Sequence, residues 1–285
     1  MDRNGEEQKI ALILSDIAEK IFNEVSLGFD PEVFDVLDNL DSTEQQIEFL
    51  KVKIGEDILA RLFGIANSVY FGQLKRGKVD TFYEVITRLG MDLTKLIIIF
   101  MSMAALSKDE EVKIIFARSF ATSILASKLI ANECGLTYED TKKVEIGGLL
   151  LEIGKIMIVV YRSLYPDDYK QAGIDESFVT EHHTTLGLMF IEKYNFSENL
   201  KDIISAKYLT LGQKLVKLSS IVLIAHTLVD HSFRNFHNKL IIASPLPDPD
   251  GNITYTTGWA IESMFKAVGL SKHIKLLNPS QTNQK

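Results

Sequence analysis

The chain has 285 residues, of which 46% are hydrophobic and 24% charged, and its formal net charge is −7. This composition is typical of a globular protein whose core is large enough to fold without cross-links, as one large domain or two small ones. A negative net charge repels phosphate backbones, which argues against nucleic acid as a partner.

The cysteine count and the apolar runs exclude two further classes. Cys134 is the single cysteine, so an internal disulfide is excluded and a reducing compartment is favoured. The first ten residues, MDRNGEEQKI, lack the apolar stretch of a signal peptide, and we therefore expect a cytoplasmic protein. The longest apolar run, residues 96–106, is much shorter than the roughly 20 residues that cross a bilayer. It predicts a buried helix and no membrane partner.

Apolar residues recur at helical spacing along most of the chain, and no alternating pattern indicates a sheet. The chain is therefore predicted to be all-α. In chain order, the expected helices cover residues 6–25, a segment that begins at Asp30-Pro31, a segment that follows Ser42, residues 56–68 and 81–89, a segment that follows Asp92, and residues 109–134, 139–165, 176–194, 197–208, 212–236 and 259–268.

Several of these helices carry end signals. Ser42 and Gln45 resemble a capping box, in which a hydroxyl and a side-chain amide satisfy free backbone N–H groups. Asp92 and Ser197 are expected to cap the helices that follow them, because their side chains accept from the same kind of group. Gly90 is expected to end the short helix before it.

Local motifs for well-known chemistry are missing or incomplete. A phosphate-binding P-loop needs four residues between its glycines and a hydroxyl after the lysine, but Gly148 and Gly154 are separated by five residues and Ile156 takes the place of the hydroxyl. His226 and Asp230, four apart on one predicted helix, could face one metal ion. Two ligands do not complete a site, so polar positions at the helix end are the favoured interpretation.

The segment 147–161, GGLLLEIGKIMIVVY, contains one acid and one base in an otherwise apolar run. The two charged residues, Glu152 and Lys155, are three apart and can form an intrahelical ion pair. The glycines allow neighbouring helices to approach closely. The segment is either the floor of a site or only the inside of a helical bundle.

Four stretches together resemble the HDOD family, the HD-related output domains of bacterial signalling proteins. They are IANSVYFG at residues 65–72, TRLG at 87–90, GLLLEIGK at 148–155, and the helix in which His183 is followed by Gly187 and Tyr194. The resemblance implies a multi-helix HD-like bundle with an N-terminal helical lobe. It also suggests a set of structural positions: Asn67, Ser68, Gly90, Gly154 and Gly187.

The resemblance divides the chain into three parts. Residues 1–28 are expected to form an additional N-terminal helix, residues 29–236 the HDOD domain, and residues 237–285 a C-terminal loop, helix and tail. Within the domain, a break in the helical pattern separates expected lobes of about 29–107 and 108–236.

The departures from the HD phosphohydrolases concern the metal ligands. Such an enzyme needs a histidine, an adjacent His-Asp pair and a distal aspartate, because nitrogens and carboxylates must converge on the ion that activates water. By the resemblance, these positions fall on Arg118, Leu151-Glu152 and His226, and a later His-His pair falls on Lys207-Tyr208. Leucine has no lone pair and a guanidinium repels a metal ion, so we expect no intact hydrolytic centre.

Three interpretations of these positions remain open. The first is helix packing without a site. The second is a relic cleft that binds a small anionic ligand and is lined by Arg118, Glu152, Lys155, His183, Lys207 and His226. The third is a rebuilt metal site that uses Glu152, His183 and His226.

The resemblance implies a non-enzymatic module of signal transduction, a regulatory helical scaffold that binds other signalling proteins and needs no cofactor. Two alternatives stay open. One is a metal-dependent phosphohydrolase of the HD superfamily, and the other is a sensor of a small anionic ligand such as a nucleotide. Metal content and phosphodiesterase activity would separate the enzyme from the scaffold.

Overall fold

The computed structural model describes residues 3–27, 32–39, 41–67, 77–107, 109–131, 136–206, 218–235, 242–243 and 255–256. Its helices are α1 (Arg3–Leu27), α2 (Glu32–Asp38), α3 (Glu44–Ile54), α4 (Glu56–Ala66), α6 (Phe82–Leu89), α7 (Met91–Leu106), α8 (Glu110–Ile124), the π-helical η1 (Leu125–Ile130), α10 (Tyr138–Leu150), α11 (Ile153–Leu164), α12 (Pro166–Ala172), α13 (Glu176–Lys193), α14 (Asn199–Ile204) and α15 (Leu218–Asn235). Two short strands, β1 (Ile242–Ala243) and β2 (Tyr255–Thr256), pair antiparallel. The all-α prediction is confirmed.

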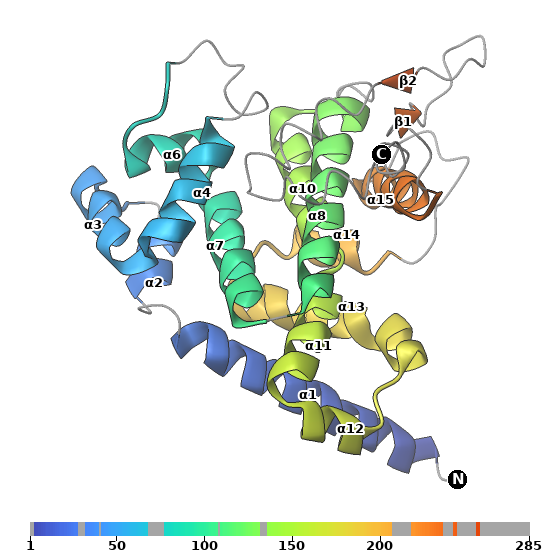
Figure 1. The fold of residues 1–285 in the computed structure, drawn as a ribbon. Coiled ribbons are helices and arrows are strands. Elements are labelled where there is room, and N and C mark those ends of the chain that lie inside the picture. Colours follow the sequence, from blue (N-terminus) through green and yellow to red (C-terminus); the bar gives the residue numbers. More distant parts are fainter. Residues whose placement is uncertain are drawn as a thin grey trace, which may run out of the picture.

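The helices form two groups that share α7 as a common wall (Figure 1). We call α2, α3, α4, α6 and α7 the N-terminal lobe, and α8 to α15 the C-terminal lobe. Helix α7 contacts α2, α4 and α6 on one side and α8 and α11 on the other. The C-terminal lobe is built around α8, α10 and α11, which pack against α13, α14 and α15.

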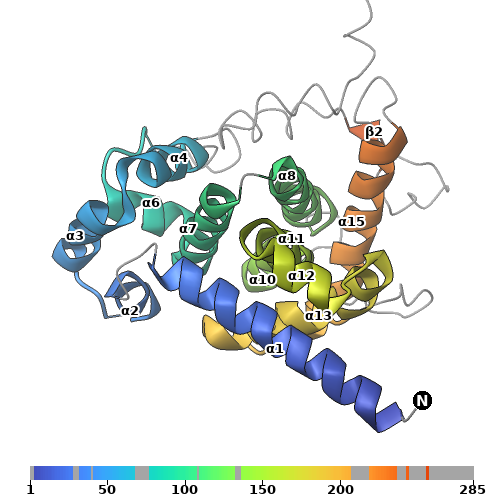
Figure 2. The ribbon, with the colours of Figure 1, turned by 60° about the horizontal axis from the view of Figure 1, so that its bottom comes forward.

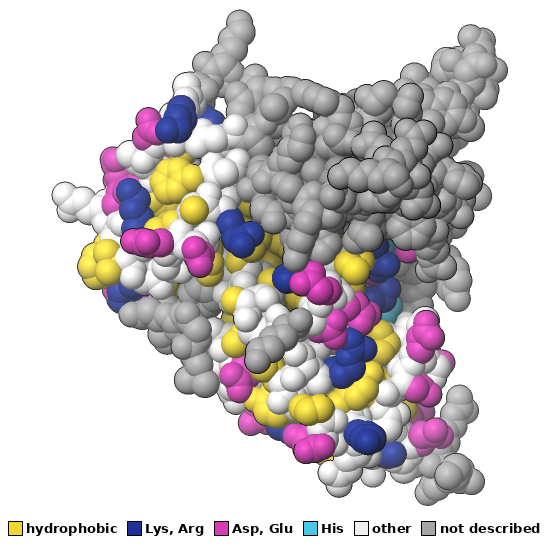
Figure 3. Space-filling model, viewed as in Figure 1, with side chains coloured by type: hydrophobic (Ala, Val, Ile, Leu, Met, Phe, Trp, Pro, Cys, Tyr) yellow, Lys and Arg dark blue, Asp and Glu magenta, His cyan; other side chains and the backbone are white. Residues whose placement is uncertain are grey.

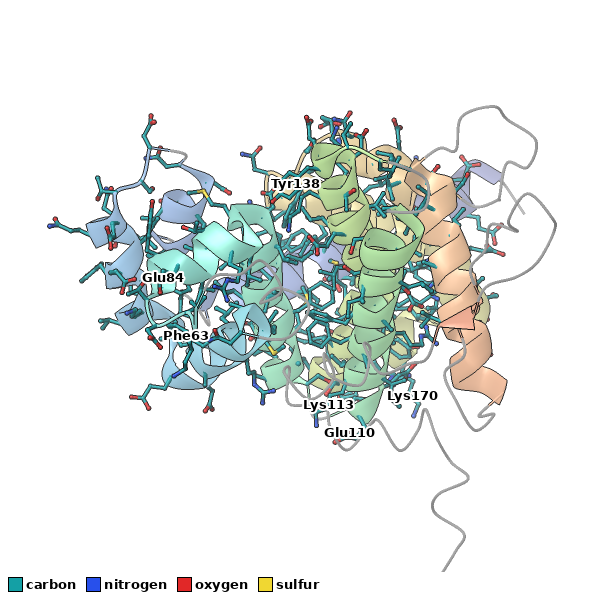
Figure 4. All side chains as sticks on the ribbon, turned by 90° about the horizontal axis from the view of Figure 1, so that it is seen from above. Phe63, Glu84, Glu110, Lys113, Tyr138 and Lys170 are labelled. Carbon is teal, nitrogen blue, oxygen red and sulfur yellow. The ribbon has the colours of Figure 1, made fainter. Side chains whose placement is uncertain are left out.

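The core between the lobes follows from the apolar run in α7. Every residue from Leu93 to Met103 is buried, as the sequence predicted for 96–106. Aromatic rings from α7 and α8 meet there, with Phe100 and Phe116 centred 4.7 Å apart and Phe116 and Phe120 centred 4.8 Å apart. Seen from above, side chains fill the space between α7 and the pair α8 and α10 (Figure 4).

None of the described helices is by itself long and apolar enough to span a bilayer. Helices α6 and α7 reach the required length and composition together, but the chain bends by 108° between them. Gly90 lies at this bend with a φ of 91°, a backbone conformation that side chains with a Cβ rarely adopt.

Helix α1 lies across the C-terminal lobe and contacts α7, α11 and α13 (Figure 2). Ile17, Ile21 and Val25, four residues apart along this helix, form an apolar stripe and are fully buried. Polar contacts add to this packing, since Tyr161 of α11 donates its hydroxyl to Asp16 at 2.6 Å and Lys20 pairs with Asp168 of α12 at 2.7 Å. The additional helix is therefore an integral part of the bundle.

A buried lysine joins the two lobes. The side chain of Lys95 on α7 is 1% exposed, and its ammonium pairs with Asp38 at the end of α2. The same ammonium donates to the backbone carbonyl of Tyr194 at 2.7 Å and lies 4.5 Å from the centre of the Phe196 ring. Because a buried charge is costly unless it is paired, these contacts favour one arrangement of the lobes.

Charged side chains of both signs are intermingled on the face shown in Figure 3. The structure contains ion pairs within and between helices, such as those of Arg162 of α11 with Asp109 and Glu111 at the start of α8. On this face the net negative charge is therefore spread rather than gathered in one patch.

Several local predictions were wrong. The capping box is formed one residue later than expected, by Thr43 and Gln46. The N-cap of α7 is Gly90, so Asp92 lies in the first turn instead. Ser197 does not cap α14, which begins after Glu198. Neighbouring residues such as Ser42 and Thr43 are similarly good caps, and only packing decides between them. A local sequence pattern does not contain this information.

Two helix boundaries in the C-terminal lobe also differ from the prediction. The helix expected over 139–165 is interrupted between α10 and α11, and α12 was missed although Pro166 at its first turn and Gly173 in the left-handed conformation are both helix-end signals. The helix expected over 259–268 lies outside the described residues.

Asn67, at the C-terminal end of α4, bonds to the backbone of Val79. Its side-chain amide donates to the carbonyl of Val79 at 3.1 Å, and its side-chain carbonyl accepts from the Val79 N–H at 2.7 Å. Val79 itself is buried, so its backbone groups depend on these bonds. Ser68, the neighbour that the sequence paired with Asn67, lies outside the described residues.

We expect Asn67→Ala to lower the free energy of unfolding by about 2 kcal/mol, because two backbone groups of a buried residue lose their partner. Chemical denaturation followed by circular dichroism measures this loss. Asn23→Ala on the exposed face of α1 is the matched control and should change stability by less than about 0.5 kcal/mol. Equal stability of the two variants would contradict the role of Asn67.

Candidate functional site

The candidate site is centred on the interruption between α10 and α11. Glu152 lies there with φ −107° and ψ 12°, outside helical geometry, and its carbonyl accepts from the N–H groups of Lys155 and Ile156 at 3.0 and 3.2 Å. It is therefore the N-cap of α11. Leu151 and Glu152 are both good helix formers, so nothing local predicts a break.

The side chain of Glu152 is held by a tertiary ion pair. Arg118 on α8 donates through Nε to Oε2 at 3.1 Å and through a terminal nitrogen to Oε1, a two-point contact between guanidinium and carboxylate. Lys155 donates to Oε1 at 2.8 Å. The carboxylate is 1% exposed, whereas the arginine and lysine side chains are 20% and 28% exposed. The buried group is thus the acid, and solvent reaches the two bases.

The electrostatics of this cluster favour the ionised carboxylate. Burial by itself raises the pKa of Glu152, but the charges of Lys155 and Arg118 outweigh it and lower the pKa from 4.5 to about 2. Both oxygens already accept hydrogen bonds from cations. Glu152 is consequently neither a general acid near neutral pH nor a free metal ligand.

Helix α15 adds His226 and Asp230 to the cluster. A carboxylate oxygen of Asp230 lies 3.6 Å from Arg118, so one guanidinium links α8 to both acids. The Nδ1 atom of His226 is buried and has no hydrogen-bond partner among the described residues. Burial lowers the pKa of this imidazole, which keeps the ring neutral.

Helix α13 supplies His183. Its Nδ1 lies 3.0 Å from the carbonyl oxygen of Val179 and 3.1 Å from that of Thr180. Burial lowers the pKa of this imidazole, and the nearby charge of Lys155 lowers it further. His183 is therefore a second neutral imidazole in the same region.

The close approach of α11 and α13 depends on Gly154. A Cβ at this position would lie 1.8 Å from the carbonyl oxygen of His183 and 3.1 Å from the backbone nitrogen of Gly187. No real pair of such atoms comes so close, so only glycine fits. The contact places the helix that carries Lys155 directly against the helix that carries His183.

Two cavities open around this cluster. The smaller cleft, of about 410 Å³, has Glu152, Lys155, His183 and His226 in its wall, together with Thr180, Thr184 and several apolar residues. The larger cavity, of about 610 Å³, is lined by charged residues of α8, α11 and α15, among them Arg118, Arg162 and Asp230. Lys155, Thr180 and His226 belong to both, so the cavities are adjacent.

The structure brings together five of the six residues that the sequence assigned to the relic cleft: Arg118, Glu152, Lys155, His183 and His226. Lys207 lies outside the described residues. Two contributors were missed. Thr180 and Thr184 lie four residues apart on α13, a spacing that places them on the same helical face, and Thr184 directly follows His183, which could have indicated them.

The donor set does not fit a hydrolytic metal centre. No group of three or more His, Cys, Asp or Glu side chains in the described part of the chain has the geometry to hold an ion. At the position of the His-Asp pair, Leu151 offers no lone pair and Glu152 is committed to two cations. Arg118 takes the position of the upstream histidine, and its guanidinium repels a divalent cation there. Arg118, Glu152, Lys155 and Asp230 instead form ion pairs with one another.

The family model of the HDOD domain matches residues 31–209, more than half of the chain. The chain belongs to the HDOD family. Helix α1 lies before the matched segment, and α15 lies after it. The HDOD domain is thus enlarged at both ends by helices that pack on its core.

Two solved structures from Shewanella amazonensis SB2B share the fold of this HDOD protein. One, named "Putative metal-dependent phosphohydrolase", has 16% sequence identity and a TM-score of 0.54, and the match covers 93% of this chain and 99% of that one. The other, named "Putative phosphohydrolase", has 17% identity and a TM-score of 0.52, with 94% and 98% covered. No curated protein is similar enough to count as a relative. At such identities the likeness extends to the fold alone.

Proposed function

We propose that this HDOD protein is a non-catalytic regulatory module of signal transduction, a helical scaffold that acts by binding other signalling proteins. The observation that carries the proposal is the state of Glu152. Its carboxylate is buried and both of its oxygens are held by Arg118 and Lys155. Glu152, which takes the position of the aspartate in the His-Asp pair of the hydrolases, therefore has a structural role.

The geometry around the cluster supports the same conclusion. Hydrolysis of a phosphoester needs a nucleophilic water with a group that activates it, either a metal ion or a free general base. Asp230, the acid that α15 adds to the cluster, lies beside Arg118, and the two imidazoles are half-buried with lowered pKa values. Both carboxylates of the cluster, Glu152 and Asp230, therefore lie beside cations.

The position of α1 supports a role in transmitting a signal. This helix packs on α11, the helix that carries Lys155, and it leads directly into the N-terminal lobe. A partner that displaces α1 would break the contact of Asp16 with Tyr161 on α11 and that of Lys20 with Asp168 on α12. It would disturb the packing of α1 on α7 of the N-terminal lobe at the same time. Helix α1 therefore contacts both lobes and the helix that carries Lys155, so that a change in its position can reach the cleft.

The alternative function is metal-dependent phosphohydrolysis, which the shared fold of the Shewanella proteins favours. The two functions differ in a direct assay. We expect the purified protein to hold no stoichiometric transition metal in elemental analysis. We also expect no hydrolysis of bis-p-nitrophenyl phosphate above background in the presence of manganese or nickel.

Glu152→Gln, prepared in parallel, is the control for this assay. A contaminating hydrolase gives the same rate in the wild type and in the variant. Turnover by the wild type that disappears in Glu152→Gln, with stoichiometric bound metal, would overturn the proposal and establish the enzyme.

A further inference from the structure

Lys155 retains hydrogen-bond donors that no described residue uses. Its ammonium has three N–H groups, and its one hydrogen bond within the described residues goes to Glu152. Arg118 and Arg162 also have five N–H groups each, but both line the larger cavity and neither lines the smaller cleft. Lys155 is also the basic residue of the smaller cleft and reaches into the larger cavity.

The ammonium of Lys155 shares its carboxylate partner with a second cation. Glu152 pairs with both Lys155 and Arg118. Arg118 and the second acid beside it, Asp230, line only the larger cavity. Glu181 lies at the rim of the smaller cleft with a side chain that is 70% exposed, where water screens its charge. An anion in this cleft therefore meets an incompletely neutralised ammonium.

The two imidazoles present complementary nitrogens. In His183, Nδ1 faces two carbonyl oxygens that only accept, so Nδ1 carries the proton and Nε2 of the neutral ring is an acceptor. In His226, Nδ1 is buried and none of the described residues hydrogen-bonds to it. An unpaired buried acceptor is tolerated better than an unpaired N–H, which places the proton of this neutral ring on Nε2. The cleft thus offers one imidazole acceptor and one imidazole donor.

The remaining wall is apolar and small. Leu151, Ile204 and Leu223 line it, with the hydroxyls of Thr180 and Thr184 between them. A volume of about 410 Å³ lies at the lower end of the roughly 300–1,000 Å³ typical of small-molecule sites. The cleft therefore has room for a compact organic molecule rather than for a polymer.

We infer that the smaller cleft binds a small organic anion that carries a hydroxyl group beside its phosphate or carboxylate. Lys155 and the Nε2–H of His226 donate to the anion, and Nε2 of His183 accepts from the hydroxyl. The inference rests on the proposed function, because a module without catalysis binds such a molecule and releases it unchanged. A bound molecule would contact α11, α13 and α15 at once. The relative position of these helices would then depend on the ligand concentration.

Thermal unfolding with matched probes tests the inference. Glycerol 3-phosphate and glycerate carry the anion and the hydroxyl, n-propyl phosphate lacks the hydroxyl, and glycerol lacks the anion. We expect glycerol 3-phosphate or glycerate to raise the melting temperature in a concentration-dependent way, n-propyl phosphate to do so less, and glycerol at equal concentration not at all. The stronger of the first two probes identifies phosphate or carboxylate as the anion.

Variants locate the binding. Lys155→Gln should weaken the binding of the active probe about 10- to 100-fold, because a charge-assisted hydrogen bond is lost. Lys155→Arg should retain part of the affinity. Lys78→Gln, which changes an exposed lysine whose side chain is 79% accessible, should bind like the wild type. Unfolding without any probe shows whether each variant is folded.

His183→Phe provides an independent readout if Lys155→Gln fails to fold. It should abolish the preference for glycerol 3-phosphate over n-propyl phosphate. If neither hydroxylated anion binds to the wild type, or if Lys155→Gln binds like the wild type, the inference fails and the proposed function stands. Release of inorganic phosphate from glycerol 3-phosphate, measured in the same samples, would instead overturn the proposed function.

Discussion

Gly154→Ala is expected to lower the free energy of unfolding by about 3 kcal/mol, near the upper end of the usual cost of overpacking. The reason is the identity of the atom that a Cβ would meet. The carbonyl oxygen of His183, at 1.8 Å, belongs to the backbone of α13 and cannot rotate away as a side chain can. Helices α11 and α13 must separate, and the apolar contacts between them are lost. Urea denaturation measures the effect.

Gly5→Ala is the matched control for this substitution. Gly5 lies in the exposed first turns of α1, and a Cβ there would meet nothing within 4 Å. Because alanine is the better helix former, this change should be neutral or should stabilise the protein by up to about 1 kcal/mol. If Gly154→Ala proves as harmless as Gly5→Ala, the helices can slide apart freely and the cleft is not rigid.

Arg118→Met is expected to lower the free energy of unfolding by about 3 kcal/mol, more than Glu152→Gln, for which we expect about 1–2 kcal/mol. The asymmetry follows from burial. Without the guanidinium, a carboxylate that is 1% exposed keeps only Lys155 as its partner. Without the carboxylate, both bases still reach solvent, and Arg118 keeps Asp230. Chemical denaturation at pH 7 compares the free energies of unfolding of the two variants. A larger loss in Glu152→Gln than in Arg118→Met would contradict the argument from the buried carboxylate.

The pH dependence provides a second check on the same cluster. The folded-state pKa of Glu152 is lowered from 4.5 to about 2, so its ionised form contributes stability that is complete above about pH 4.5. This contribution is lost as the pH falls from 4.5 towards 2, where the carboxylate becomes protonated. Glu152→Gln cannot titrate there, so its stability should fall less steeply than that of the wild type over this interval. Parallel pH profiles would contradict the buried ion pair.

The helical class and most helix positions followed from apolar periodicity. The stripe on α1, the burial of α7 and the bounds of α13 all agree with prediction to within a few residues, because each depends on which face of a helix must leave water. The membership in the HDOD family was likewise recognisable from short stretches in the right order. Cap residues were less predictable, since Ser42 and Thr43 are equally good candidates and only packing distinguishes them.

The composition of the site was predictable, but its geometry was not. Residue types alone exclude metal ligation at Leu151 and Arg118, since an aliphatic side chain has no lone pair and a guanidinium is always charged. Periodicity predicted one unbroken helix from 139 to 165, with Glu152 paired only to its neighbour Lys155. The apolar periodicity contained no signal for the interruption at Glu152, where α11 begins. This interruption lets the Glu152 side chain pair with Arg118 of α8, which lies 34 residues earlier in the chain.

Local sequence therefore decided which atoms are available and which helix faces are buried, because both depend on side-chain chemistry and on a spacing of three or four residues. The tertiary structure alone decided that Arg118, Glu152 and His226 share one cluster and that Lys155 keeps donors that no described residue uses. Ion pairing and desolvation act through space between helices far apart in the chain, and their balance becomes apparent only when α8, α11 and α15 are packed together.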